Sequence, residues 1–321
     1  MKNKLVYLVA LFGYWVGIDL VFYWLNRRCK RILTLHNVFP DELCREDDGG
    51  GMSMSVSQFK RMIREVRKRF RISNDLDDVG AVTLTFDDGF LNQYEVAFKA
   101  LKEMGIPAML FVAGKNINRT DPMQAPAVDL LTAWLDVVPE DVIDGRDKLR
   151  YWIDVLRPRY VKDAAHYGYR VVEECDRLYP FARVFSVLGP EYLSLRLGGV
   201  AEAQLDEMRQ AGWRIGWHSQ NHYPLAAIPT EKKMLEFESP RTMRCEPMSY
   251  PYGELLSVSA ADTACAERAG FPCAYSNLYI NNQLRGRYFL PRFGADQDKV
   301  LLHFHLSGFW HFLKYRKLLP R

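Results

Sequence analysis

The chain of 321 residues lacks several patterns that would indicate a function directly. Its six cysteines include no C-x-x-C pair and no tight framework spacing, which argues against a zinc ribbon and a disulfide scaffold. It has no phosphate loop of the G-x-x-x-x-G-K type, no internal repeat and no low-complexity tract. The 43 Lys and Arg exceed the 39 Asp and Glu by only four, so we expect no nucleic-acid partner.

The chain does have enough apolar material for a sizeable core. Hydrophobic residues make up 48% of it, aromatic residues 13% and charged residues 26%, which excludes a disordered or fibrous protein. At about 150 residues per domain, the length allows two domains or a single α/β barrel.

One long apolar run lies near the start of the chain. Between Leu5 and Leu25 the only charged residue is Asp19, and as a helix of about 1.5 Å per residue the run would match a hydrocarbon core of ~30 Å. A carboxylate near the bilayer centre costs roughly 2.5–3.5 kcal/mol, so Asp19 argues against an easy span. No small-residue cleavage site follows the run.

We therefore predict that residues 1–31 form a membrane-associating helix with a basic flank, and that residues 5–25 span the bilayer or lie in its interface. The alternative is a hydrophobic helix packed on the globular domain. Basic residues on both sides of the run would leave the rest of the chain on the cytoplasmic side by the positive-inside rule; they are Lys2, Lys4, Arg27, Arg28, Lys30 and Arg31. The aromatic side chains suited to headgroup depth are Tyr14, Trp15, Tyr23 and Trp24.

After residue 31, apolar runs of strand length alternate with amphipathic stretches of helix length, which is typical of βαβ units and a parallel sheet. We expect strands at 31–35, 81–86, 108–113 and 213–217, and helices at 56–70, 91–104, 201–210 and 258–269. The sequence thus predicts an α/β fold in which residues 32–321 form one barrel. An insertion over the barrel mouth is expected at about 116–199.

Two adjacent carboxylates follow one of these strands. Asp87 and Asp88 stand at the carboxyl end of the 81–86 strand, which is where βα barrels place their chemistry. Neighbouring residues of a regular strand point to opposite faces, so the pair can converge only if the chain turns, and Gly89 is expected to supply that turn. Because two close carboxylates repel, a cation is the simplest way to relieve them.

Further ligands for a cation follow another predicted strand. His218 and His222 stand four residues apart after the 213–217 strand. Alone this spacing is weak, since H-x-x-x-H also occurs by chance. With the strand-end carboxylates it predicts a metal held by Asp88, His218 and His222, with room left for water and substrate.

Three motifs carry a family resemblance. TFDDG (85–89), the H-S-x-x-H run (218–222) and SYPYG (249–253) resemble the ordered motifs of the NodB-homology polysaccharide deacetylases, carbohydrate esterase family four. The resemblance continues through AMLFVA (108–113) and LPRF (290–293). It implies a distorted (β/α) barrel, a divalent metal and hydrolysis of N-acetyl groups on a glycan. It also implies that Asp87 is the base, that Asp88 is a metal ligand and that the Tyr252 backbone amide faces the oxyanion.

The sequence departs from the family pattern in two places. Members commonly have an Arg two residues before the Pro-Tyr-Gly run, and here that residue is Ser249, so we expect Arg292 to steady the base instead. The catalytic L-x-x-H motif matches residues 33–36 before TFDDG, as in a rearranged branch of the family, and also matches 302–305. We favour His36 as the acid, because it follows a predicted strand, whereas His303 and His305 lie in a run suited to a core or interface helix.

The sequence therefore predicts a metal-dependent hydrolase that removes N-acetyl groups from an N-acetylhexosamine-containing glycan, and the apolar run near its start is compatible with a membrane- or lipid-linked glycan. Zn²⁺ is the expected ion, with Co²⁺ or Ni²⁺ as substitutes. One alternative is a catalytically inactive, membrane-attached glycan-binding barrel, which would be expected if one of Asp87, Asp88, His218 or His222 were replaced. A phosphoryl-transfer enzyme is disfavoured, because that chemistry typically spaces its carboxylates as D-x-D. No protein partner is indicated.

Overall fold

The computed structural model describes residues 2–44, 53–119, 189–254, 256–278 and 286–319. Eight of its strands form one parallel sheet in the order β10-β1-β4-β5-β6-β7-β8-β9. They are β1 (Arg31–Leu35), β4 (Val82–Asp88), β5 (Met109–Val112), β6 (Arg214–Trp217), β7 (Met248–Ser249), β8 (Ala274–Ser276), β9 (Leu290–Pro291) and β10 (Phe293–Gly294). A small parallel sheet pairs β2 (Asn37–Phe39) with β3 (Ser53–Ser55).

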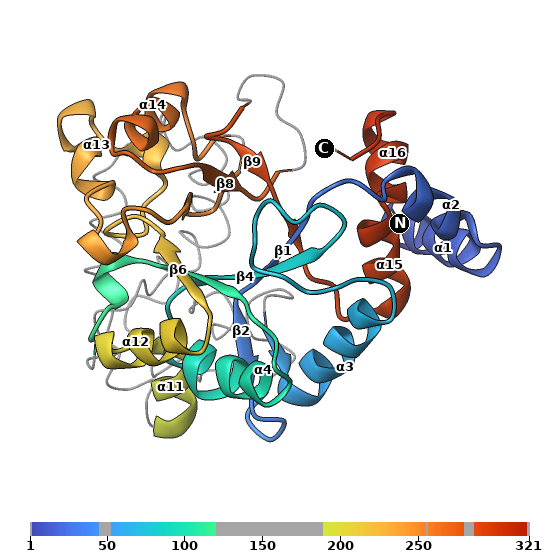
Figure 1. Cartoon of the computed structure of the whole chain (residues 1–321), viewed down its shortest axis with the longest axis horizontal. Coiled ribbons are helices and arrows are strands. Elements are labelled where there is room, and N and C mark those ends of the chain that lie inside the picture. Colours follow the sequence, from blue (N-terminus) through green and yellow to red (C-terminus); the bar gives the residue numbers. More distant parts are fainter. Residues whose placement is uncertain (1, 45–52, 120–188, 255, 279–285, 320–321) are drawn as a thin grey trace, which may run out of the picture.

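The helices lie around this sheet (Figure 1). They are α1 (Lys2–Trp15), α2 (Ile18–Leu25), α3 (Val56–Arg67), α4 (Lys99–Glu103), α11 (Pro190–Leu197), α12 (Glu202–Gln210), α13 (Thr230–Glu236), α14 (Ala260–Arg268), α15 (Lys299–Ser307) and α16 (Phe309–Tyr315). A π-helical turn, Gln93–Phe98, runs directly into α4. The predicted strands and helices are all present, with ends that differ by a few residues.

One short segment connects the two edges of the sheet. β9 pairs with β8 and β10 pairs with β1, and only Arg292 separates β9 from β10. The strand order therefore closes on itself, which makes the sheet a nearly closed parallel barrel. The predicted (β/α) barrel is confirmed, and its closure places Arg292 between the first and last strands.

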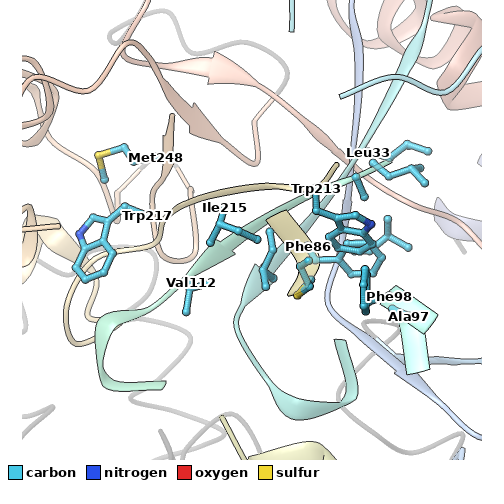
Figure 2. Close-up of a cluster of buried hydrophobic side chains, with 14 of the residues drawn as sticks. Leu33, Phe86, Ala97, Phe98, Val112, Trp213, Ile215, Trp217 and Met248 are labelled. Carbon is cyan, nitrogen blue, oxygen red and sulfur yellow. The ribbon is translucent and has the colours of Figure 1, made fainter. Parts of the chain in front are cut away.

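Strand side chains alternate between the barrel interior and the layer beneath the helices. In β5, Leu110 and Val112 belong to the large cluster shared with the helices, whereas Met109 and Phe111 belong to a small interior cluster. In β4, Phe86 lies in the outer layer, where its ring stacks on Trp213 with centroids 5.6 Å apart (Figure 2). By the same alternation Asp87, one residue on from Phe86, faces the barrel interior.

The helix expected over residues 5–25 is in fact two helices. The chain breaks between α1 and α2, where Gly17 has φ +77°, and the two axes are bent by 82°. Gly17 is suited to this break because it lacks the Cβ that opposes positive φ in other residues. Among the described residues, no single helix is long and apolar enough to cross a membrane; the bent pair meets the requirement by length and composition only.

The predicted insertion lies mostly outside the described residues, which omit 120–188. The chain on its two sides adjoins, because Asn118 N donates to Val200 O (2.8 Å) and Gly199 N donates to Arg119 O (3.0 Å). The described residues on the two sides of the omitted stretch thus lie next to each other at one place in the barrel.

Candidate active site

The predicted site residues gather at the carboxyl ends of neighbouring strands. Asp87 and Asp88 end β4, His218 follows β6 directly, and His36 follows β1. Because all of these strands are parallel, their carboxyl ends lie at one mouth of the barrel. Topology therefore brings together residues that are far apart in the sequence.

Asp87 forms a two-pronged ion pair with Arg292 inside the barrel. Arg292 Nη1 donates to Asp87 Oδ1 (2.8 Å) and Nη2 donates to Oδ2 (2.6 Å), and both side chains are almost fully buried. The guanidinium also donates to Thr85 Oγ1 (3.1 Å) and Asn277 Oδ1 (3.2 Å), and it lies 5.2 Å from the Phe111 ring centroid. The structure places Arg292 where a partner for Asp87 was expected.

The Asp87 carboxyl is held in its ionised form. Burial acts to raise its pKa, but the nearby charges of Arg292 and His218 and the hydrogen bonds from Arg292 outweigh burial and leave the pKa below its usual value. Asp87 is therefore a carboxylate at neutral pH and is able to accept a proton.

Asp88 lies in different surroundings. Its Oδ1 is 3.0 Å from His222 Nε2 and 3.4 Å from His218 Nε2. Burial acts to raise the pKa of Asp88, but the two facing imidazoles outweigh it and hold the pKa well below its usual value. One carboxylate oxygen and two imidazole nitrogens thus converge, as predicted for Asp88, His218 and His222.

The cluster fits a metal ion. Its three ligand atoms all lie within 4.8 Å of one another, and Asp88 Oδ1 is buried without a well-aligned hydrogen-bond donor. His218 Nδ1 is 2.9 Å from the carbonyl oxygen of Ser249, which can only accept, so we assign the proton to Nδ1. With one proton kept on Nδ1, Nε2 would lose its own proton and give its lone pair to a bound cation, which is the tautomer a metal requires.

Ser249 connects the two aspartates. Its hydroxyl lies 2.6 Å from His218 Nδ1 and donates to Asp87 Oδ1 at 3.3 Å. This residue occupies the position where the family commonly has an Arg. Here the hydroxyl joins the Asp87–Arg292 pair to the histidine that faces Asp88.

The backbone is strained around the cluster. Six non-glycine residues of the described chain have positive φ, and four belong to this region: Asp88 (+88°), Ser219 (+65°), His222 (+57°) and Tyr252 (+62°). Such conformations cost roughly 1–3 kcal/mol each and concentrate at functional sites. Gly89 has φ +82° and takes part in the turn as expected, and Asp88 before it also has a positive φ.

Tyr252 lies beside the cluster. Its ring centroid is 5.1 Å from that of His222, and its carbonyl oxygen accepts a bond from Asn277 Nδ2 (3.2 Å). The role of its backbone amide at an oxyanion stays a prediction.

His36 lines a cavity of about 210 Å³ at the strand ends; the other lining residues are Thr34, Leu35, Met54, Asn277, Gly294 and Ala295. Burial lowers the pKa of His36, and the negative charges of Asp88 and Asp87 act against that shift. The imidazole is therefore within electrostatic reach of both aspartates. Its role as the acid stays a prediction.

The competing histidines lie elsewhere. His303 and His305 belong to α15, which packs against α1 and α2. His303 Nδ1 is hydrogen bonded to Tyr23 Oη (2.7 Å), and the His305 ring stacks on Phe293. These contacts match the interface helix expected for that run.

Two positioning residues escaped the sequence analysis. Gln93 Oε1 accepts from the backbone N–H groups of Gly89 (3.0 Å) and Phe90 (3.1 Å), and its Nε2 donates to the carbonyl oxygen of Asp87. Glu236 accepts from Asn221 N (2.8 Å) and Nδ2 (2.7 Å) and so anchors the loop between the two histidines. The sequence shows each of them only as a polar residue near a strand-end loop. That each one bonds to the backbone of such a loop is seen only in the structure.

Comparison with known proteins agrees with this geometry. A model of the family described as polysaccharide deacetylase matches residues 76–267, more than half of the chain. A search of curated proteins finds no match. The chain resembles the structure of IcaB from Ammonifex degensii at 16% identity, with a TM-score of 0.51 over 87% of this chain and 97% of that one. It also resembles the Streptococcus pyogenes deacetylase PplD, in complex with acetate, at 14% identity, with a TM-score of 0.50 over 85% and 96%.

At such identities the structural likeness shows the fold, and the sequence match shows the family. An inactive glycan-binding barrel would be expected to lack at least one of four site residues. All four are present and lie at one mouth of the barrel: Asp87, Asp88, His218 and His222. The chain belongs to the polysaccharide deacetylase family and is a deacetylase enzyme that acts on glycans.

Proposed function

We propose that this enzyme hydrolyses the acetamide of an N-acetylhexosamine residue in a glycan, using a divalent cation held by Asp88, His218 and His222. The observation that carries the proposal is the contrast between two adjacent carboxylates. Asp87 is neutralised by a guanidinium, whereas Asp88 faces two imidazole nitrogens. Neighbouring titratable groups in such different surroundings are suited to different tasks.

A divalent cation held by Asp88, His218 and His222 would supply polarisation of the acetamide carbonyl and would lower the pKa of a bound water. One carboxylate oxygen and two imidazole nitrogens suit Zn²⁺, and also Co²⁺ or Ni²⁺. The bond from His218 Nδ1 to Ser249 holds that ring in the orientation its role as a ligand needs.

Asp87 is the proposed general base. Its pairing with Arg292 keeps it ionised, and a carboxylate with about four lone-pair directions still has room for one more donor. It takes the proton from the attacking water as the new C–O bond forms.

His36 is the proposed general acid. The acetamide C–N bond breaks as the imidazole delivers a proton to the departing nitrogen, which leaves as the free amine while acetate is released. Its place in the cavity at the strand ends supports this role. The backbone amide of Tyr252, set at φ +62°, is proposed to donate to the oxyanion of the tetrahedral intermediate.

The division between the two aspartates can be tested with the Asp87→Asn and Asp88→Asn variants. Metal content is measured by elemental analysis, and acetate release is measured on a panel of N-acetylglucosamine oligomers. Asp87→Asn should retain the metal and lose turnover by about 10²–10⁴-fold, whereas Asp88→Asn should lose both. Asp77→Asn is the control, since that side chain is 95% exposed. Equal metal loss in both site variants would refute the division, and wild-type activity without any divalent ion would refute the metal.

A further inference from the structure

The outer surface of α1 and α2 is almost entirely apolar. Its most exposed side chains are 57–78% accessible and come from both helices: Leu5, Leu8, Phe12, Trp15, Val21 and Trp24. We refer to the exposed side chains of residues 5–25 as the apolar face. Figure 1 shows the two helices at one edge of the molecule, beyond α15 and away from the sheet.

The polarity of this helix pair is inverted relative to a surface helix in water. The single charge of residues 5–25, Asp19, is only 3% exposed. Toward the protein the pair contacts α15 and α16, with Ala10 and Phe22 in the apolar cluster that they share. A surface helix of a globular protein normally directs its charges outward and its apolar stripe inward. Here the carboxylate is buried and the apolar residues are exposed.

This orientation removes the objection that Asp19 raises from the sequence alone. A carboxylate on the outside of the helix would be costly to place in hydrocarbon. Because Asp19 is buried against the protein, the apolar face offers no charge to the medium around it. The face also extends over both helices, which makes it larger than the isolated apolar residues common on protein surfaces.

A basic rim borders the apolar face. Arg27 and Arg28 follow α2 directly and are exposed, and the Arg27 guanidinium lies 4.6 Å from the Trp24 ring centroid. Leu319 N donates to Asn26 Oδ1 (3.0 Å) beside this rim, and the exposed Lys317 stands two residues earlier in the chain. Cations beside exposed tryptophans match the charge and polarity of the headgroup layer.

We propose that the apolar face docks into one leaflet of a membrane that carries anionic lipids, with the basic rim at the headgroups. The bend of 82° and the contacts with α15 and α16 hold the pair as part of the protein, so that the enzyme binds as a monotopic membrane protein. This inference is independent of the catalytic proposal. The basic rim favours the anionic cytoplasmic leaflet.

A second copy of this chain is the other occupant to consider. The basic rims of two copies joined through their apolar faces would lie close to each other, and like charges disfavour that arrangement. Anionic headgroups would instead be complementary to the rim.

The test measures co-sedimentation of the full chain with vesicles of phosphatidylcholine alone and of phosphatidylcholine with phosphatidylglycerol at about four to one. We expect binding to both, stronger to the anionic vesicles, and weakened but not abolished by salt. The double variant Phe12→Glu/Val21→Glu should lower the partition coefficient by at least about tenfold, because it places one charge on each exposed helix surface. Val79→Glu is the matched control: Val79 is 50% exposed and lies in a turn outside the face.

Unchanged thermal unfolding of both variants shows that any loss of binding comes from the surface. Equal binding by the double variant and the control would overturn the proposal. The proposal would also be overturned if the wild-type chain does not bind the vesicles and forms a dimer instead, and the double variant does not form that dimer. A cleavable tag at the N-terminus should remain open to protease added outside the vesicles, and its protection would show a spanning segment and refute docking in one leaflet.

Discussion

Replacing Arg292 by Met tests the charge balance of the site most directly. The substitution keeps an unbranched side chain, shorter than that of Arg, and removes the cation that faces Asp87. Both partners of this pair are buried, with side-chain exposures of 0% and 1%, so bulk solvent does not compensate for the lost donors. The Arg292→Met variant therefore leaves an uncompensated carboxylate inside the barrel.

The magnitude follows from that burial. Removing one partner of a buried pair costs about 3–5 kcal/mol in the free energy of unfolding, against a total of about 5–15 kcal/mol for ordinary proteins. At roughly 2 °C per kcal/mol for a chain of this size, the melting temperature should fall by roughly 6–10 °C. The pKa of Asp87 should rise, because burial then acts without the opposing charge of Arg292.

The lowered pKa of Asp87 sets the direction in which stability and activity change with pH. In the wild-type protein the pKa of Asp87 is lowered, so its stabilising contribution is complete above the unfolded pKa of about 3.9 and is lost as the pH falls through the folded value. In the variant, the acid limb of kcat/KM should move to higher pH, and activity at pH 6 should fall more than activity at pH 8.

The assay combines thermal unfolding with acetate release across pH. Arg31→Met is the control: Arg31 is also buried, but its guanidinium donates to backbone carbonyl oxygens of Leu306, Cys29 and Asn26. This control should lose stability without moving the pH profile. The Asp87→Asn/Arg292→Met double variant should recover part of the stability that Arg292→Met loses, because no buried charge is left alone. An Arg292→Met variant with an unchanged acid limb, or an equal shift in Arg31→Met, would refute the reasoning.

His36→Ala should abolish turnover with the metal retained, whereas His303→Ala and His305→Ala should keep most activity; the opposite result in acetate-release assays would move the acid to α15. Gly89→Ala should lower stability by about 1–3 kcal/mol in thermal unfolding, because Gly89 has φ +82° and an added Cβ would lie 2.6 Å from Val112 Cγ1; unchanged melting would contradict this. Burial lowers the pKa of both His303 and His305 to about 4, so the unfolded chain binds more protons than the folded one between about pH 6.5 and 4. The melting temperature should therefore fall as the pH falls through that range, and less steeply in a His303→Gln/His305→Gln variant.

Local patterns were enough to locate the secondary structure of the barrel. The 56–70 helix is an example: Ser55 and Gln58 form the predicted capping box, and the buried residues recur at helical spacing. The break at Gly17 was missed, because an apolar run has the same composition whether it is one helix or two. Which way the chain turns there depends on its packing against α15 and α16.

The sequence by itself determined which titratable residues meet at the barrel mouth. Asp87, Asp88, His218 and His222 stand directly after apolar runs or at the ends of strands, and parallel strands place such ends together. Arg292 was also expected, because Ser249 left Asp87 without a cation.

Only the tertiary structure decided the different surroundings of these residues and the direction in which the buried charges face. Asp87 and Asp88 are chemically identical neighbours, and they differ because barrel closure brings Arg292 to one, whereas a positive φ turns the other toward two imidazoles. Gln93 and Glu236 act on backbone groups of distant loops, and such contacts leave no pattern along the chain. Asp19 faces the protein because the packing of the whole helix pair sets its rotation, so the exposed surface of residues 5–25 is apolar for a reason that no local pattern contains.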